Sequence, residues 1–424
     1  MAAREQLIID MFTEASRAGS FGGDVVDFVG FKSGNDKAVT AHYLSAVEFG
    51  EVTLEMKNSE QVVQPVLIKT QIRAAPFPSR ATSNDIFHNE VSFYTKVAPL
   101  LQKYDTCNVL STSFPELVYG KAIGKPEEDV VVLKDLRQKG FQPCVPDNLD
   151  ERHIELVLDR LGKFHALSFL CKLKDPIEFE EVASQMREVD LLEPMMVFGG
   201  FVSKETFREG MFRGIKPLQK EAEYREKLTE LSANCDNAHD LLGKYRYDSS
   251  HLGIMAHGDF RVTNMMFKYQ SDGTPFEVVF FDFQMMAIGP PAVDVCLFMM
   301  FEVPAELRRA RWEKFLHVYH DAVSYQMREH CNEIPSMETI ELNIRKRGIF
   351  AYYFYAILWP NMLSDKNGLG MISPPKKEDL NEEEVQKTME TYLQSLREWG
   401  GPKVTKMLAE AVRFMIDKKF IFEY

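Results

Sequence analysis

Several common signatures are absent from this chain of 424 residues. No GxxxxGK[ST] phosphate-binding loop occurs, which argues against the P-loop class of nucleotide enzymes. The six cysteines are scattered and include no CxxC pair, so neither a disulfide framework nor a zinc site is expected. The net charge is −13, so the basic surface that nucleic acids require is also missing.

Two further absences concern the location of the protein. The first ten residues lack the apolar core of a signal peptide. The longest apolar stretch, residues 349–359, is too short to span a bilayer and is followed by Pro360. Together with the scattered thiols, these features predict a cytoplasmic protein without membrane insertion.

One motif stands out among the residues that are present. Residues 257–264 read HGDFRVTN after a short apolar run, and a second apolar run ends at Asp282. Phosphoryl transfer needs an acidic group that orients the attacking hydroxyl and oxygen ligands that hold magnesium on the nucleotide phosphates. We interpret Asp259 as the acidic group, and Asn264 and Asp282 as magnesium ligands. The alternatives are an ordinary polar turn and a strand-end aspartate that caps a turn.

A lysine and a glutamate in the first part of the chain complete such a site. Lys69 ends the apolar run 66–68, and Glu90 lies on or beside the apolar face of a helix expected at residues 84–97. A buried glutamate needs a partner, and we predict that Lys69 pairs with it while also contacting the nucleotide phosphates. The alternative is a solvated lysine and an unrelated glutamate.

Three weaker candidates surround these residues. Residues 30–37, with Gly34 and Asn35, are the candidate phosphate loop, although a β-turn explains them nearly as well and the GxGxxG pattern is absent. Asp294 either braces the HGD motif through backbone N–H groups or caps a helix. His257 is expected to shape its loop rather than to transfer protons.

The order of secondary structure predicts two lobes. Strands are expected at residues 40–49, 52–57, 62–70 and 130–133, and most of the later chain has helical periodicity. We therefore predict an α+β fold with a strand-rich lobe, residues 1–137, and a larger helical lobe, residues 138–424. This is the layout of protein kinases.

Two helices of the second lobe have informative patterns. One expected helix presents a single apolar face, made of Ile154, Val157, Leu158, Leu161 and Phe164. The other, near residues 350–359, is dense in aromatic side chains. Its aromatic rings either fill the core or line an apolar substrate pocket.

The chain resembles the ecdysteroid kinase-like family, a branch of the choline kinase and aminoglycoside phosphotransferase fold. The resemblance rests on HGDFRVTN, DFQ at residues 282–284, VLIK ending at Lys69, NEVSFY around Glu90, VVVLKDL and LGKFHALSF. It implies a bilobal kinase-like fold, ATP and magnesium as cofactors, and phosphorylation of a hydroxyl group on a small molecule. The chain lacks the Asn-Tyr pair that often follows the loop glycine in the family, since Asn35 precedes Asp36 here.

The sequence hypothesis is therefore an ATP-dependent small-molecule kinase, with a steroid alcohol such as an ecdysteroid as the first substrate candidate. One alternative is a kinase of choline, ethanolamine or xenobiotic alcohols, which would need an acidic, aromatic-walled pocket for a cation. The other alternative is a catalytically silent protein that binds nucleotide or another ligand. No sequence pattern indicates the oligomeric state.

Overall fold

The structure, a computed structural model, describes residues 2–34, 45–71, 80–144, 149–189, 204–363 and 380–422. The first part of the chain forms an antiparallel five-stranded sheet. In spatial order its strands are β1 (Val25–Ser33), β2 (Ser45–Met56), β3 (Gln61–Gln71), β5 (Val130–Lys134) and β4 (Leu117–Lys121).

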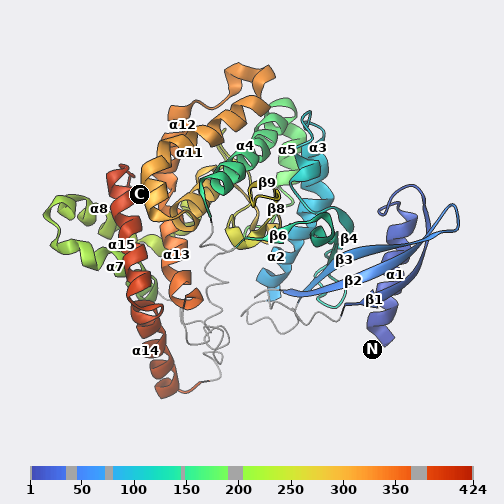
Figure 1. The fold of residues 1–424 in the computed structure, drawn as a ribbon. Helices are drawn as coiled ribbons and strands as arrows, with labels where there is room; N and C mark the ends of the chain where they lie inside the picture. Colours follow the sequence, from blue (N-terminus) through green and yellow to red (C-terminus); the bar gives the residue numbers. More distant parts are fainter. Residues whose placement is uncertain are drawn as a thin grey trace.

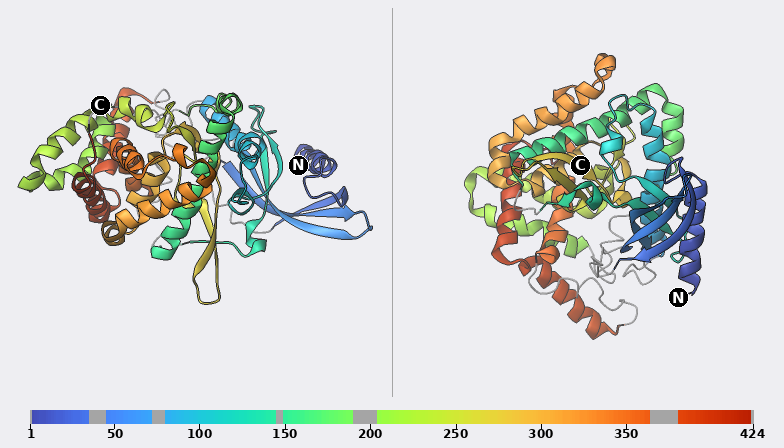
Figure 2. Two further views of the ribbon diagram at one scale, coloured as in Figure 1. Left: turned by 90° about the horizontal axis from the view of Figure 1, so that it is seen from above. Right: turned by 45° about the vertical axis from the view of Figure 1, so that its right-hand side comes forward.

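Helix α1 (Ala2–Arg17) covers one face of this sheet (Figures 1 and 2). Met11 and Phe12 of α1 pack against Val52, Leu54 and other inward side chains of the strands. The Phe12 ring stacks on those of Phe28 and Phe31, with centroids 5.5 Å apart in each pair. The N-terminal lobe therefore has its own small apolar core.

The first strands differ from the sequence prediction. Residues 52–57 are not a separate strand, because β2 runs without a break through Gly50 to Met56. Gly50 is needed for close approach rather than for a turn, since a side chain there would collide with the Phe31 ring of the neighbouring strand. Strand β1 was not predicted, because its mixture of apolar and polar residues has no clear alternation.

A helical rod lies between the sheet and the larger lobe (Figure 1). It consists of α2 (Arg80–Ser92), a π-helical turn (Phe93–Val97) and α3 (Ala98–Gln102). After β5, two residues form β6 (Gln142–Pro143), which pairs with β8 (Met265–Tyr269). The boundary at residues 137/138 stays a prediction, but the chain on either side of it changes from sheet to helices as expected.

Most of the remaining chain is helical. Its helices are α4 (Glu151–Lys174), α5 (Pro176–Ala183), α7 (Lys204–Ile215), α8 (Arg225–Asp236), α9 (Ala238–Arg246), α10 (Ala292–Leu297), α11 (Ala305–Gln326), α12 (Met337–Arg347), α13 (Ile349–Met362), α14 (Glu382–Glu398) and α15 (Gly401–Asp417). The predicted apolar face of α4 is fully buried from Ile154 to Phe164. The fold is thus bilobal and kinase-like, as predicted.

Short strands between these helices carry the HGD and DFQ motifs. Strands β7 (Ile254–Ala256) and β10 (Ala287–Gly289) form one pair, while β9 (Pro275–Phe280) pairs with β8. Residues 257–264 follow β7, and Asp282 follows β9. Among the described residues, no helix combines the length and apolarity needed to cross a bilayer.

Candidate active site

Three charged side chains from distant parts of the chain meet where the two lobes face each other. Lys69 Nζ lies 2.5 Å from Glu90 Oε2 and 2.7 Å from Asp282 Oδ1. All three side chains are buried. They come from β3, α2 and the turn after β9, and we call them the lysine triad. The expected contact between Lys69 and Glu90 is present, while the nucleotide-binding role of the pair stays a prediction.

Burial and charge oppose each other in the lysine triad. Burial alone would lower the pKa of Lys69, but the carboxylates of Asp282 and Glu90 outweigh it and hold that pKa above its ordinary value. Burial raises the pKa of Glu90, and the positive charge of Lys69 offsets only part of this rise. Lys69 therefore remains protonated at physiological pH.

The backbone of Asp282 is in the left-handed region, with φ of 68°. Residues other than glycine adopt this conformation uncommonly, although aspartate tolerates it better than most. The turn redirects the chain directly after the buried strand β9, and the Asp282 carboxylate receives a hydrogen bond from Lys69. Backbone strain of this kind often accompanies a functional side chain.

The helix that carries Glu90 is fastened to the helical lobe. The Asn89 side chain donates to the carbonyl of Arg187 at 2.8 Å and accepts from the N–H of Arg187 at 2.9 Å. His88 Nε2 lies 3.0 Å from the carbonyl of Gln185. We call this set of contacts the α2 clamp. It ties α2 to the segment after α5, next to the position from which Glu90 reaches Lys69.

Aromatic packing joins the same helix to the DFQ motif. The rings of Phe93 and Phe283 are stacked with centroids 3.5 Å apart and an interplanar angle of 5°. Phe114 and Phe164 contact this pair edge-on. The residue after Asp282 is therefore fixed against the rod that bears Glu90.

Residues 257–264, which we call the HGD loop, bring Asp259 and Asn264 together. Asn264 Nδ2 donates to the backbone carbonyl of Asp259 at 2.9 Å and to its Oδ2 at 3.0 Å. Asp259 Oδ1 is buried and has no hydrogen-bond partner among the described residues. A carboxylate oxygen that is buried and unpaired is costly unless a ligand completes it.

Asp294 accepts hydrogen bonds from the backbone of the HGD loop. Its two carboxylate oxygens accept the N–H groups of His257 and Gly258 at 2.7 and 2.8 Å. His165 Nε2 lies 3.1 Å from Asp294 Oδ2, and the Tyr319 hydroxyl lies 2.8 Å from the other ring nitrogen of His165. Of the two alternatives for Asp294, the structure contains the brace, and these hydrogen bonds help to keep the pKa of Asp294 low despite its burial.

Two neighbours in the HGD loop explain its shape. A side chain at position 258 would collide with the carbonyl of Met285, and Gly258 also has a φ of 80°, so glycine is required there. His257 Nε2 lies 3.0 Å from the carbonyl of Phe281, one residue before Asp282. His257 therefore connects the HGD loop to the DFQ turn, consistent with a shaping role.

The first part of the candidate phosphate loop is a strand. Residues 30–33 belong to β1 and pair with β2, so they are strand rather than loop. Gly34 follows the strand, and its N–H donates to the carbonyl of Phe49 at 2.8 Å. A side chain at Gly34 would crowd that carbonyl. Asn35 lies outside the described residues.

The aromatic helix α13 is mainly core, and one of its residues reaches the site. Tyr352, Tyr353 and Tyr355 are almost fully buried. The Tyr355 hydroxyl donates to Glu302 Oε1 at 2.6 Å, and Arg261 Nε of the HGD loop lies 3.8 Å from the same oxygen. Burial raises the pKa of Glu302, against the opposing effect of Arg261. Glu302 thus links α13 to the HGD loop.

The donors near Asp282 suit a hard divalent cation. Asn264 uses its amide nitrogen for Asp259, which leaves its amide oxygen as a ligand, and Asp282 contributes a carboxylate. Magnesium commonly takes one or two such protein ligands together with substrate phosphates and water. No group of three or more histidine, cysteine or acidic residues suited to a metal is found in the described ranges. A site shared with phosphates therefore fits better than a closed protein cage.

Comparison with known proteins identifies the family. A model of the ecdysteroid kinase-like family matches residues 40–333, which is 294 of the 424 residues. The chain belongs to the ecdysteroid kinase-like family. Family and fold together identify a small-molecule kinase.

Other comparisons are less informative. A search of curated proteins finds no match. Among solved structures, a microcompartment-associated aminopropanol kinase is similar over 94% of this chain and 96% of its own, with 12% sequence identity and a TM-score of 0.40. A likeness this weak carries no argument about substrate.

Several residues around the site were not found from the sequence. Asn89 and Phe93 flank Glu90, and Phe283 follows Asp282, so adjacency to a candidate was the available signal. Their partners, Arg187 and the Phe114–Phe164 pair, are too distant in sequence to be inferred without the fold. Glu302 follows a run of methionine and phenylalanine, and a lone acidic residue after such a run was a detectable signal.

Proposed function

We propose that this protein transfers the γ-phosphoryl group of ATP to a hydroxyl group of a small molecule, with magnesium on the nucleotide phosphates. The hydroxyl oxygen forms a bond to the γ-phosphorus, the bond from that phosphorus to the bridging oxygen breaks, and ADP leaves. Asp259 orients the hydroxyl and accepts its proton. The observation that carries the proposal is the buried, unpaired Oδ1 of Asp259 beside Asn264.

Each remaining residue has a role in this proposal. Asn264 and Asp282 hold magnesium, and Lys69 contacts the nucleotide phosphates while Glu90 keeps it in place. Asp294 and His257 are positioning residues, because they contact the loop backbone rather than reacting groups. Gly34 belongs to the candidate phosphate loop, which would contact the nucleotide. The retention of every acidic and amide group supports an active kinase over a silent binding protein.

For the acceptor, we propose a neutral alcohol, with an ecdysteroid-type steroid alcohol as the first candidate. The family supports the steroid. A choline-like substrate would need an open acidic group for its cation. Glu302, whose pKa is raised by burial and by the nearby charge of Asp259, already accepts from Tyr355 and faces Arg261. This commitment of Glu302 favours a neutral acceptor over a cationic one.

The deciding experiment is mass spectrometry of products after incubation with magnesium and ATP. The acceptor panel contains ecdysteroids, choline, ethanolamine and plant alcohols, and Asp259→Asn is run in parallel. A steroid that gains one phosphoryl group with the unaltered protein, with a rate about 10²- to 10⁴-fold lower in the variant, supports the proposal.

Other outcomes would change it in defined ways. Phosphorylation of choline or a plant alcohol keeps the mechanism and replaces the acceptor class. Undiminished transfer by Asp259→Asn rejects the role of Asp259, and full activity after removal of divalent cations rejects the magnesium assignment. Nucleotide binding without transfer to any acceptor would favour the silent protein.

A further inference from the structure

Gln326, the last residue of α11, has a buried amide that lacks partners. Its side chain is 4% exposed, and neither Nε2 nor Oε1 has a hydrogen-bond partner in the part of the chain that the structure describes. Buried amides are almost always paired, and an unpaired one destabilises the folded state. A donor and an acceptor side by side, both unused, indicate a position where another molecule completes the structure.

The same residue lines a cavity of about 260 Å³. The cavity lies between the end of the α2–α3 rod, the C-terminal turn of α4 and the end of α11. Its lining residues are Lys103, Tyr104, Thr106, Leu170, Lys174, Gln326, Arg328, Glu329 and His330. We call it the Gln326 cavity. None of these residues belongs to the lysine triad or the HGD loop.

Positive charge predominates around the Gln326 cavity. Lys103, Lys174 and Arg328 face one acidic lining residue, Glu329. Lys103 is engaged by Glu178, and Arg328 Nη1 donates to the carbonyl of Tyr325 at 2.8 Å. For Lys174, no ion pair occurs within the described ranges, and it is exposed at the edge of the cavity. An anion would therefore find at least one uncommitted cation.

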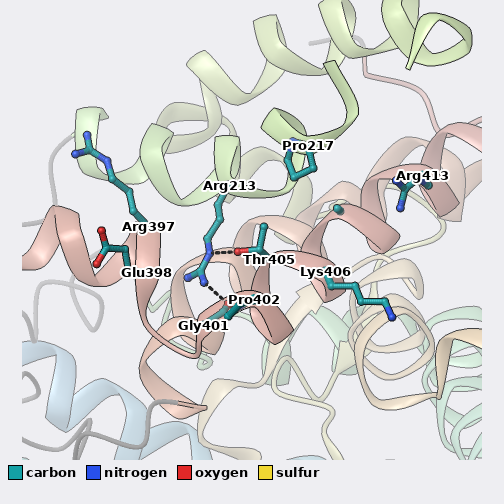
Figure 3. A pocket seen from close by; sticks show the side chains of 10 residues that line it. Arg213, Pro217, Arg397, Glu398, Gly401, Pro402, Thr405, Lys406 and Arg413 are labelled. Carbon is teal, nitrogen blue, oxygen red and sulfur yellow. Dashed lines mark hydrogen bonds between the residues drawn. The ribbon is translucent and has the colours of Figure 1, made fainter. Parts of the chain in front are cut away.

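A larger cavity elsewhere in the helical lobe is a useful contrast (Figure 3). It measures about 630 Å³ and also contains several cations. Arg213 there donates to Thr405 Oγ1 and to the carbonyls of Leu396, Trp399 and Gly401, so its guanidinium is fully engaged in fastening α14 and α15. Charge alone does not distinguish the two cavities, whereas an unpaired buried amide does.

We propose that the Gln326 cavity binds the phosphate group of a small metabolite or free phosphate, at a site separate from the active site. One phosphate oxygen accepts from Gln326 Nε2, a P–OH group donates to Oε1, and Lys174 and Arg328 balance the charge. At about 260 Å³ the cavity is below the usual range for drug-sized ligands. A volume of this size suits a small anion better than ATP or a steroid. The proposal does not depend on the proposed function.

The experiment is thermal unfolding of the full chain with increasing inorganic phosphate, at ionic strength held constant with chloride. We expect a saturable rise in Tm, because a ligand that binds only the folded state stabilises it. The rise should be lost in Gln326→Leu and reduced in Lys174→Gln. The matched control, Lys406→Gln, removes an equivalent charge from the larger cavity and should leave the rise intact.

The Leu variant gives a second readout that needs no ligand. Without phosphate, Gln326→Leu should unfold at a higher temperature than the unaltered protein, because an unpaired amide has been removed. A lower Tm would mean that the amide already has a partner, and the proposal would be overturned. It would also be overturned if phosphate acted no differently from chloride, or equally on Lys174→Gln and the unaltered protein. Lys174 is exposed, so this variant folds even if the Leu variant does not.

Glycerol phosphate separates the two sources of the phosphate group. A larger rise in Tm than with inorganic phosphate at equal concentration supports a phosphorylated metabolite. An equal or smaller rise supports free phosphate.

Discussion

Lys69, Glu90 and Asp282 come from three distant segments and meet through charge, whereas Asp259 and Asn264 lie five residues apart and are held through hydrogen bonds. The lysine triad spans both lobes, and its geometry depends on how β3, α2 and the DFQ turn are packed. The HGD loop belongs to one lobe, and Asp294 fixes its backbone directly. The geometry of the lysine triad thus depends on the arrangement of the lobes, whereas that of the HGD loop depends on Asp294.

This comparison predicts two kinds of failure. Loss of the brace should damage folding and activity together, because a buried carboxylate and two backbone N–H groups are involved. Changes in the lysine triad should reduce activity more than stability, because its members can compensate one another by a shift of protons.

The largest effect is expected from Asp294→Ala. Removing the carboxylate leaves the N–H groups of His257 and Gly258 and the ring of His165 without their partner. We expect the free energy of unfolding to fall by about 3–5 kcal/mol, with loss of kinase activity. Urea denaturation and the kinase assay measure the two effects.

Asp129→Ala is the matched control for this brace. Asp129 is equally buried and also accepts two backbone N–H groups, those of Ile123 and Gly124, at 2.6 and 3.1 Å. It should lose stability and keep its kcat/KM. Equal losses of activity in both variants would mean that the brace has no specific role in the site.

Lys69→Met should have the next largest effect. It removes the charge that pairs Glu90 with Asp282, and we expect kcat/KM for ATP to fall by about 10²- to 10³-fold. Lys134→Met on the adjacent strand β5 is the control, because Lys134 forms a partly exposed ion pair with Glu116. A similar loss in both variants would argue against a special role for Lys69.

Phe283→Leu should have a smaller effect. It removes the stacked contact with Phe93 that links the DFQ turn to the rod, which is worth about 1 kcal/mol beyond buried area. We expect lower stability and a higher KM for ATP. Phe12→Leu removes stacking in the core beneath α1 and should reduce stability without changing KM.

The smallest effect is expected from Glu90→Gln, and the size of this effect depends on pH. Burial raises the pKa of Glu90 to about 7, against the effect of Lys69, so activity that needs the ionised form should decline as pH falls below about 7. The stability of the fold should instead increase as pH falls. A pKa raised on folding stabilises the protein at low pH, and that contribution is lost as pH rises through about 7.

The amide variant should abolish both pH dependences while lowering kcat/KM at pH 8 only about fivefold, since about 1 kcal/mol of hydrogen-bond energy is at stake. Measurements of kcat/KM and Tm from pH 5 to pH 9 test this. An unchanged pH profile in Glu90→Gln would assign the dependence to another group.

The HGD loop was predictable from the sequence. Of the long-range contacts, only the one between Lys69 and Glu90 was predicted. The HGD loop is a continuous motif, so the proximity of Asp259 and Asn264 followed from spacing. The contact between Lys69 and Glu90 required the additional assumption of two lobes. The stacking of Phe93 on Phe283 and the pairing of Asn89 with Arg187 depend on packing that no local pattern encodes.

The errors in the fold prediction have physical causes as well. The strands expected at residues 40–49 and 52–57 were separated by a polar break at Gly50 and Glu51. Here Gly50 makes room for the ring of Phe31, so the same residue permits a long strand instead of ending one. Gly30 likewise lies within a strand, so residues 30–33 of the predicted loop belong to β1.

The α2 clamp has a consequence for how such an enzyme could be controlled. Many kinases are switched off by swinging the glutamate-bearing helix away from its lysine. Here the reciprocal hydrogen bonds between Asn89 and Arg187 attach that helix to the other lobe. Asn89 is next to Glu90, the residue that would have to move away from Lys69. A swing of that helix would therefore have to break both hydrogen bonds to Arg187 as well as the contact between Glu90 and Lys69.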